Sequence, residues 1–461
     1  MEEPEAERTE ISGDRDALTY PQPNTALADL LTQSGWNTRQ LASAVNRVGA
    51  ECGLSLHYDD SAVHHWLSGT MPRVAVRPCV LEAFARRLHR PVTSFQAGFT
   101  DSPDPARPST DTVAGLVDLG SADMDPTRRG VLAAGLYSAA LAIPGWQDVS
   151  GRFGLLRRDP HVRIGSAEVE AVRQVTEHIS DLDDQFGGRM ARPLAAAFLV
   201  NTIAPYLAAE APADVRQAML SAAADHCYLT GYMAMDERAD ALAQSYWGQA
   251  LNLAGAAEDH LTYCTTLRGM SVQAVDLGHS RLSLRLAESA SAASPQAGPR
   301  MLAFLAGQQA HAAAQSGYRA EALANLTQAE TAMDRAESQS KPFGSYDPSS
   351  LNYHVAQVRY ELGDKGASIA ILDESARLQH SSYRRARIRR LGMIAERKLE
   401  IGRLEEACGD WNRMLDDYPQ VQSGRADDKF RIMMAAIRPH QRNPHARALH
   451  ERARTLVRPK A

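Results

Sequence analysis

Apolar residues recur at three- and four-residue intervals along most of the chain, a spacing that places them on one face of an α-helix. Between residues 24 and 99 the pattern divides into four short amphipathic segments. From residue 165 to about residue 440 it continues through longer segments separated by short breaks. The alternation of apolar and polar positions that is typical of strands is rare. The pattern predicts an all-α protein.

The four N-terminal segments are expected to pack around one small core. Asn37 and Asp59 precede the second and third segments, and their side chains can accept hydrogen bonds from the free amides at a helix start. The predicted core residues are Leu41, Ala42, Val63, Trp66, Leu67, Leu81, Phe84, Leu88 and Val92.

The breaks in the second half of the chain are regular. Their turn positions are Asp236, Gly278, Gly317, Gly363 and Gly402, which are 42, 39, 46 and 39 residues apart. A helical segment precedes and follows each turn. Two-helix units at a fixed period are typical of a helical solenoid, because one hairpin cannot bury its apolar face alone but a stack can. Small residues such as Gly231, Ala274 and Ala310 would let neighbouring helices approach closely.

Composition suggests the remaining boundaries. Residues 1–23 contain seven acids and two arginines and are predicted to be disordered, and residues 441–461 are predicted to form a basic tail. Residues 100–125 begin with a Pro/Ser/Asp-rich stretch and are predicted to be a linker. The helical-repeat domain is placed at residues 165–440, after an apolar connecting helix at residues 126–146.

That connecting segment has a second interpretation. Arg128 and Arg129 precede an uncharged run from Gly130 to Gly145, as in a twin-arginine export signal. The run lies far from the N-terminus and is shorter than the roughly 20 apolar residues of a membrane span. The five cysteines are scattered, as in a protein with reduced thiols. We therefore expect a cytoplasmic protein without a membrane segment.

Catalytic and metal motifs are missing from the sequence. We find no phosphate-binding Gly-rich loop, HExxH or nucleophile elbow, so no enzyme activity, cofactor or metal is predicted. His64 and His65 are consecutive, so on a helix they point about 100° apart and are poorly placed to share a metal ion. Adjacent glycines in Phe186–Met190 are expected at a turn, and Asp181, Asp183 and Asp184 at an acidic, exposed helix end.

Arginines are concentrated at residues 381–398. Arg384, Arg385, Arg387, Arg389 and Arg390 form a collar that could contact DNA or an acidic partner, or could offset neighbouring carboxylates. We favour the second role. The net charge of −5, with seven arginines and five acids in residues 24–99, allows only a local nucleic-acid contact.

The N-terminal segments resemble the repressor-type (Xre/Cro-like) helix-turn-helix family. The resemblance is carried by NTRQLA at residues 37–42, SAVHHWLSG at residues 61–69 and the LEAFARRLHRPV that follows. It implies double-stranded DNA as partner, with the third helix in the major groove and the start of the second helix at phosphates. The residues implied to contact DNA are Asn37, Thr38, Arg39, Asp60, Ser61, His64, His65 and Arg73.

Two features depart from that family. Leu41 and Asp59 are 18 positions apart, which implies a longer second helix or an inserted loop in place of the family's tight turn. Asp59 and Asp60 at the head of the third helix would also repel phosphate. An adaptor that has lost DNA binding is therefore the alternative hypothesis.

The repeated segments are similar to tetratricopeptide hairpins, through their Gly-containing turns and the RAEAL and RLEEA that follow at residues 319–323 and 403–407. Together with the N-terminal block, they resemble actinobacterial transcriptional regulators of differentiation or secondary metabolism. The resemblance implies a homodimer whose repeats bind a peptide, small-molecule or protein effector in a groove. The candidate groove residues are Gln273, Gln308, Asn352 and Arg359.

Overall fold

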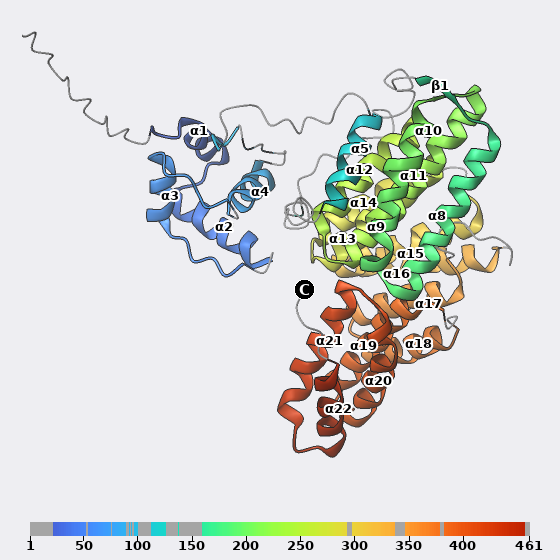
Figure 1. The fold of residues 1–461 in the computed structure, drawn as a ribbon. Helices are drawn as coiled ribbons and strands as arrows, with labels where there is room; N and C mark the ends of the chain where they lie inside the picture. Colours follow the sequence, from blue (N-terminus) through green and yellow to red (C-terminus); the bar gives the residue numbers. More distant parts are fainter. Residues whose placement is uncertain are drawn as a thin grey trace, which may run out of the picture. The chain divides into compact units, whose positions relative to one another are not determined.

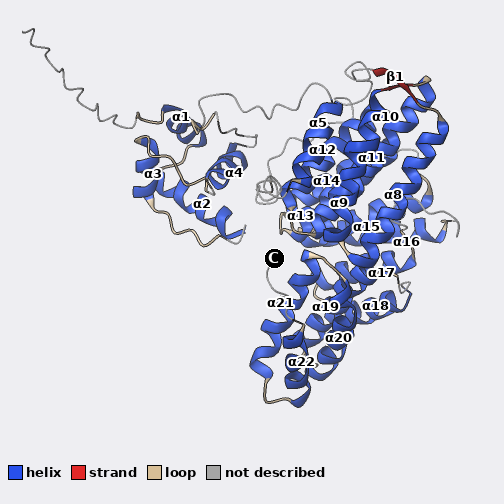
Figure 2. Ribbon diagram, in the orientation of Figure 1, coloured by secondary structure: helices blue, strands red, loops and turns tan. Residues whose placement is uncertain are grey.

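The computed structural model describes residues 22–51, 54–74, 76–88, 92, 94, 96–99, 112–125, 137, 159–292, 297–336, 346–378 and 382–456. Nearly all the elements formed by these residues are helices (Figure 2). Two short strands, β1 (Asp159–Arg163) and β2 (Ala209–Glu210), pair in parallel. The prediction of an all-α fold is confirmed. The chain forms two compact units, Met1–Pro105 and Ala106–Ala461, which are described separately.

The N-terminal unit contains four helices, α1 (Thr25–Ser34), α2 (Thr38–Glu51), α3 (Asp60–Leu67) and α4 (Arg77–Leu88). Of the predicted core, Leu41, Ala42, Val63, Trp66, Phe84 and Val92 are buried, whereas Leu67, Leu81 and Leu88 are only partly buried. Both predicted caps form. Asn37 and Gln40 exchange hydrogen bonds of 2.9 and 3.0 Å as a capping box, and Asp59 accepts from the amide of Ala62 at 3.0 Å.

The C-terminal unit starts with α5 (Thr112–Met124), α8 (Ser166–Phe186), α9 (Gly188–Phe198), the π-helical turn η2 (Leu199–Ile203) and α10 (Ala204–Ala208) (Figure 1). Ten helices then follow as five pairs. They are α11 (Ala213–Asp236) with α12 (Asp240–Ala256), α13 (His260–Asp276) with α14 (Ser280–Ala292), α15 (Pro299–Gln315) with α16 (Arg319–Asp334), α17 (Pro348–Glu361) with α18 (Lys365–Leu378), and α19 (Arg384–Glu400) with α20 (Leu404–Asp417). The unit ends with η3 (Tyr418–Gln420), α21 (Gly424–Ile437), η4 (Arg438–His440) and α22 (Pro444–Thr455).

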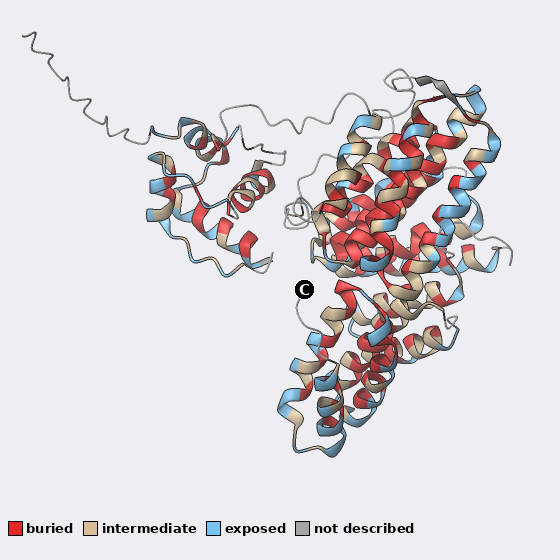
Figure 3. Cartoon of the chain, in the orientation of Figure 1, coloured by how far each residue is buried: buried red, intermediate tan, exposed pale blue. Residues whose placement is uncertain are grey.

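These pairs are the hairpins predicted from the regular turns. Four turns have a glycine with positive φ, at Gly278, Gly317, Gly363 and Gly402. In the first pair the left-handed residue is Arg238, two positions after the predicted Asp236. Buried residues concentrate where the helices of neighbouring pairs meet (Figure 3).

Small residues set the spacing of the first pairs, as expected. Gly231 of α11 lies so close to α12 that an added Cβ would be 2.6 Å from Nε1 of Trp247. Trp247 is completely buried, and its indole N–H donates to the carbonyl of Tyr228 at 3.0 Å. A larger residue at position 231 would therefore displace a central core side chain.

The last helices of the unit return to its first ones. The amide of Gln422, just before α21, donates to the carbonyl of Phe186 at 2.6 Å, and the amide of Arg189 donates to the carbonyl of Gln422 at 3.1 Å. Gly187 has a φ of 90°, and a Cβ there would overlap the backbone of Gln422. The adjacent glycines therefore form a backbone docking point, in addition to the expected turn.

Two predicted boundaries change. The predicted linker at residues 100–125 includes α5, in which Leu116 is fully buried. The predicted basic tail at residues 441–461 includes α22, which packs through Ala446, Leu449 and Ala453, so the folded unit extends to Thr455. The predicted disordered segment lies outside the described residues except for residues 22 and 23, as does the connecting helix at residues 126–146 except for Tyr137. No helix within the described ranges has the length and apolarity to cross a membrane.

Candidate functional site

The outward face of α3 carries the residues expected to contact DNA bases. Val63 and Trp66 are buried and fix the rotation of the helix about its axis. Asp60, Ser61, His64 and His65 are consequently exposed. The side chains of Ser61, His64 and His65 make no hydrogen bond within the described part of the chain, so all three are available to a partner.

The residues expected at phosphates also lie at the surface of the N-terminal unit. Asn37, Arg39 and Arg73 are exposed, and Thr38 is partly exposed. The capping box, however, engages Oδ1 and the backbone N–H of Asn37. The remaining donor of this residue, its Nδ2 amide, is the group available for a phosphate.

The connection between α2 and α3 is long. It spans residues 52–59, compared with the three or four residues typical of a helix-turn-helix. Its last part is fixed to α2, because Asn46 donates to and accepts from the backbone of Tyr58, both at 2.8 Å. The Tyr58 ring packs edge-on against Trp66 with 5.1 Å between centroids. The head of α3 is therefore held in place despite the longer link.

A second candidate site lies inside the C-terminal unit. A cavity of about 400 Å³ is lined by α8 and by the first helix of each of the five pairs. None of the second helices contributes a lining residue. Cavities of this size hold small molecules.

The lining is aromatic and charged. Tyr228, Tyr232, Phe304, Tyr346, Tyr353 and Tyr383 supply aromatic surface. The basic side chains are Arg173, Arg268, Arg385, Arg389 and Arg390, and the acidic ones are Glu177, Asp181, Asp183, Asp184, Asp276 and Asp347.

The sequence predicted this cavity only in part. Of the four candidate groove residues, Gln308 lines it. Gln273 does not, since it lies about 100° around α13 from Val272 and faces α12. Its amide donates to the side chain and carbonyl of Asp240 at 2.8 and 3.0 Å, so its placement in the groove was wrong. Asn352 and Arg359 lie on α17 outside the lining of this cavity, and Arg359 is exposed.

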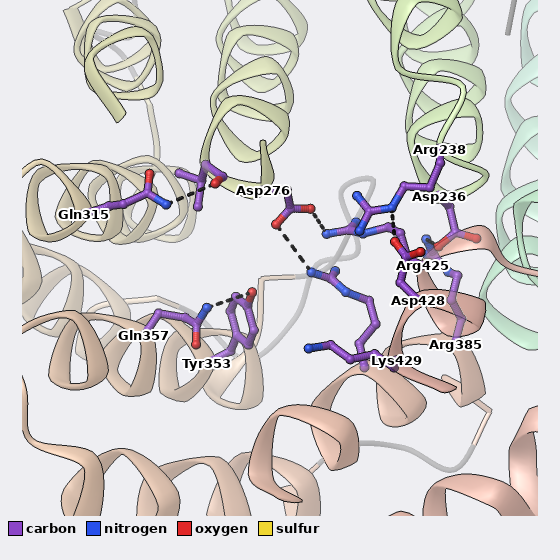
Figure 4. Close-up of polar contacts among 12 residues, drawn as sticks. Asp236, Arg238, Asp276, Gln315, Tyr353, Gln357, Arg385, Arg425, Asp428 and Lys429 are labelled. Atoms are coloured by element: carbon purple, nitrogen blue, oxygen red, sulfur yellow. Dashed lines mark hydrogen bonds and ion pairs between the residues drawn. The ribbon is translucent and has the colours of Figure 1, made fainter. Parts of the chain in front are cut away.

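Ion pairs join α8 and α13 to the last helices of the unit, and Figure 4 shows those of Asp276. Arg385 pairs with Asp183 at 3.0 Å and with Asp184 at 2.7 Å. Asp276 is shared by Arg425 and Arg389, the latter at 3.8 Å. Burial raises the pKa of Asp183 to about 8, although Arg385 opposes the shift. The expectation that Asp183 lies at an exposed helix end was wrong.

Three of the five collar arginines have carboxylate partners. Arg385 and Arg389 pair as described above, and Arg387 pairs with Asp417 at 2.5 Å. Arg390 is buried and donates to Oγ of Ser349 at 2.8 Å and to the carbonyl of Ser375 at 2.7 Å. These contacts support the interpretation that the collar offsets neighbouring carboxylates. Among the described residues, no group of three or more His, Cys, Asp and Glu side chains is arranged to hold a metal ion.

Comparison with known proteins adds one match. Residues 27–100 are similar to the family described as the SP15 N-terminal domain. The matched segment starts within α1 and ends just beyond α4, so it corresponds to the N-terminal unit. A search of curated proteins finds no match to the chain.

Proposed function

We propose that the chain is a DNA-binding transcriptional regulator in which α3 recognises an operator and the C-terminal unit binds an effector. The observation that carries the proposal is the outward face of α3, where the exposed side chains of Ser61, His64 and His65 make no hydrogen bond to the described part of the chain. A helix of this kind, backed by a buried Val63 and Trp66, fits the major groove.

The phosphate contacts in this proposal come from the edges of that face. Arg39 and Arg73 are exposed, and Thr38 lies at the first turn of α2, where free helix amides favour an anion. With few basic residues, the N-terminal unit would bind DNA modestly as a monomer. We therefore propose a cytoplasmic homodimer that occupies two half-sites.

The helical pairs of the C-terminal unit support the effector role. Their likeness to tetratricopeptide hairpins, together with a cavity on the first helices, matches a ligand-binding repeat array. Occupation of the cavity would favour one arrangement of the helices and so change the presentation of the paired DNA-binding units.

An adaptor without DNA binding is the second candidate. It is favoured by Asp59 and Asp60, which place negative charge at the head of α3, and by the eight-residue link before it. In that case the chain would act by holding another protein or a peptide in the groove of its repeats.

Selection of bound fragments from genomic DNA distinguishes the two candidates. The full chain is compared with Ser61→Ala/His65→Ala and with Thr32→Ala, a matched change on the exposed face of α1. We expect an enriched site for the wild type and Thr32→Ala, and a roughly tenfold or greater loss of affinity in the double variant, because each lost base contact costs about 1–3 kcal/mol. Binding should weaken steeply with salt. The absence of an enriched site, or a site indifferent to the double change, would refute DNA recognition by α3.

A further inference from the structure

Arg268 of α13 lines the cavity and has no carboxylate partner among the described residues. No Asp or Glu carboxylate of the described chain lies within ion-pair distance of its guanidinium. Its Nε is buried and makes no hydrogen bond. The cavity's other central arginines are engaged, since Arg385 and Arg389 pair with aspartates and Arg390 with a hydroxyl and a carbonyl.

The neighbours of Arg268 hold it in place without neutralising it. Its guanidinium carbon lies 4.0 Å from the ring centroid of Phe304, a cation–π contact. Its Nη2 lies 3.5 Å from Nε2 of His354, whose Nδ1 is 2.7 Å from the hydroxyl of Tyr346. Because Arg268 can only donate, Nε2 of His354 accepts and Nδ1 carries the proton.

These neighbours are uncharged near neutral pH. Burial, reinforced by the charge of Arg268, holds the pKa of His354 well below its usual range. Burial also lowers the pKa of His311 to about 4 and raises that of Tyr228 to about 12. Burying a cation in such surroundings without a counter-charge costs free energy. An anion placed against Arg268 would therefore bind with a strongly favourable free energy.

The rest of the lining limits the charge of that anion. Six acidic side chains line the same cavity, several of them on α8. A dianion such as a phosphate monoester would meet their repulsion, whereas one carboxylate matches the planar fork of a single arginine. Phe304, Tyr346 and Tyr228 beside Arg268 offer apolar aromatic surface for the ligand body.

We propose that the cavity binds a small monocarboxylate with an aromatic or apolar body, and that its carboxylate pairs with Arg268. The volume of about 400 Å³ accommodates such a molecule. The inference rests on the proposed effector-binding role of the C-terminal unit, and it does not require the N-terminal unit to bind DNA.

Calorimetric titration of the full chain tests the proposal. The probes are indole-3-acetate and benzoate as monocarboxylates, phenyl phosphate as the dianionic counterpart and benzamide as the neutral one. We expect saturable binding of at least one monocarboxylate, weaker binding of phenyl phosphate and none of benzamide. In Arg268→Gln the affinity should fall about 10- to 100-fold, the usual range for loss of a charge-assisted pair.

Arg285→Gln is the matched control, since Arg285 is exposed on α14 outside the cavity. It should bind the monocarboxylates as the wild type does. Thermal unfolding of both variants shows whether Arg268→Gln still folds. Phe304→Leu keeps an apolar wall but removes the ring under Arg268, so it should weaken binding by a smaller factor than Arg268→Gln does. Failure of every monocarboxylate to bind, equal binding by Arg268→Gln, or preference for phenyl phosphate would overturn the proposal. A wild type that selects DNA but binds no probe would refute this inference alone, and the reverse result would refute only the proposed DNA recognition.

Discussion

Replacement of Arg192 by methionine should strongly destabilise the C-terminal unit. Arg192 of α9 is 1% exposed and pairs with Asp123 of α5 and with Glu237 just after α11, the latter through Nε to Oε1 at 2.7 Å. Asp123 is also buried and accepts from the hydroxyl of Tyr246 at 2.8 Å. Methionine would fill similar space but remove the ion pair between Arg192 and the buried carboxylate of Asp123. Breaking a buried pair in this way typically costs about 3–5 kcal/mol.

Urea unfolding of the full chain, followed by circular dichroism, measures this cost. Arg163→Met is the control, because Arg163 pairs with Glu210 while the two side chains are 81% and 54% exposed. This control variant should lose less than about 1 kcal/mol of unfolding free energy. The double change Arg192→Met/Asp123→Leu should destabilise the unit by less than the sum of the two single changes, since it removes both charges of this buried pair together. If Arg192→Met unfolds at the same urea concentration as Arg163→Met, the pair does not have the stabilising role described.

Two further predictions concern pH and chain docking. Burial lowers the pKa of His226 from 6.5 to about 4, so the unfolded chain binds a proton first and stability is lost as the pH falls from 6.5 towards 4. His226→Gln should have a lower free energy of unfolding than the wild type at pH 7, measured with urea. This difference between the two proteins should be smaller by about 3 kcal/mol at pH 4. A difference that does not change with pH would contradict the lowered pKa of His226. Gly187→Ala should lower the free energy of unfolding by at least about 2 kcal/mol, because the backbone of Gln422 occupies the space that a Cβ would need. It should also speed amide hydrogen exchange in α21 and α22. Gly409→Ala, with no atom near its Cβ, should be neutral or slightly stabilising, and equal exchange in both variants would contradict the docking role.

Local signals in the sequence were sufficient for much of the fold. Gly278, Gly317, Gly363 and Gly402 mark helix turns because a left-handed residue is a local requirement. The caps at Asn37 and Asp59 depend on atoms within three residues. Buried Val63 and Trp66 follow from helical spacing, which also predicts the exposed face of α3.

The cavity could not be found in the same way. Gln308 lines the cavity and Gln273 does not, although both are polar residues on the first helix of a pair. Which residue of a helix points into the cavity depends on how its helix pair is rotated against the neighbouring pairs. Arg268 gave no sequence signal at all, since its significance comes from its three-dimensional surroundings, in which no described carboxylate lies within ion-pair distance. The buried pairs of Arg192 and Arg385 join residues far apart in the chain, which periodicity cannot detect.

The return of Gln422 to Phe186 and Arg189 bears on how the C-terminal unit comes apart. In an open array of repeats, the terminal hairpins have one neighbour each and fray before the middle does. Here the last helices contact the first, so within the described residues neither end of the series of helix pairs is free to melt before the rest. The unit should lose its structure as one cooperative whole, and deletion of its last 40 or so residues, a stretch comparable to one repeat, would expose the first hairpins as well as the last.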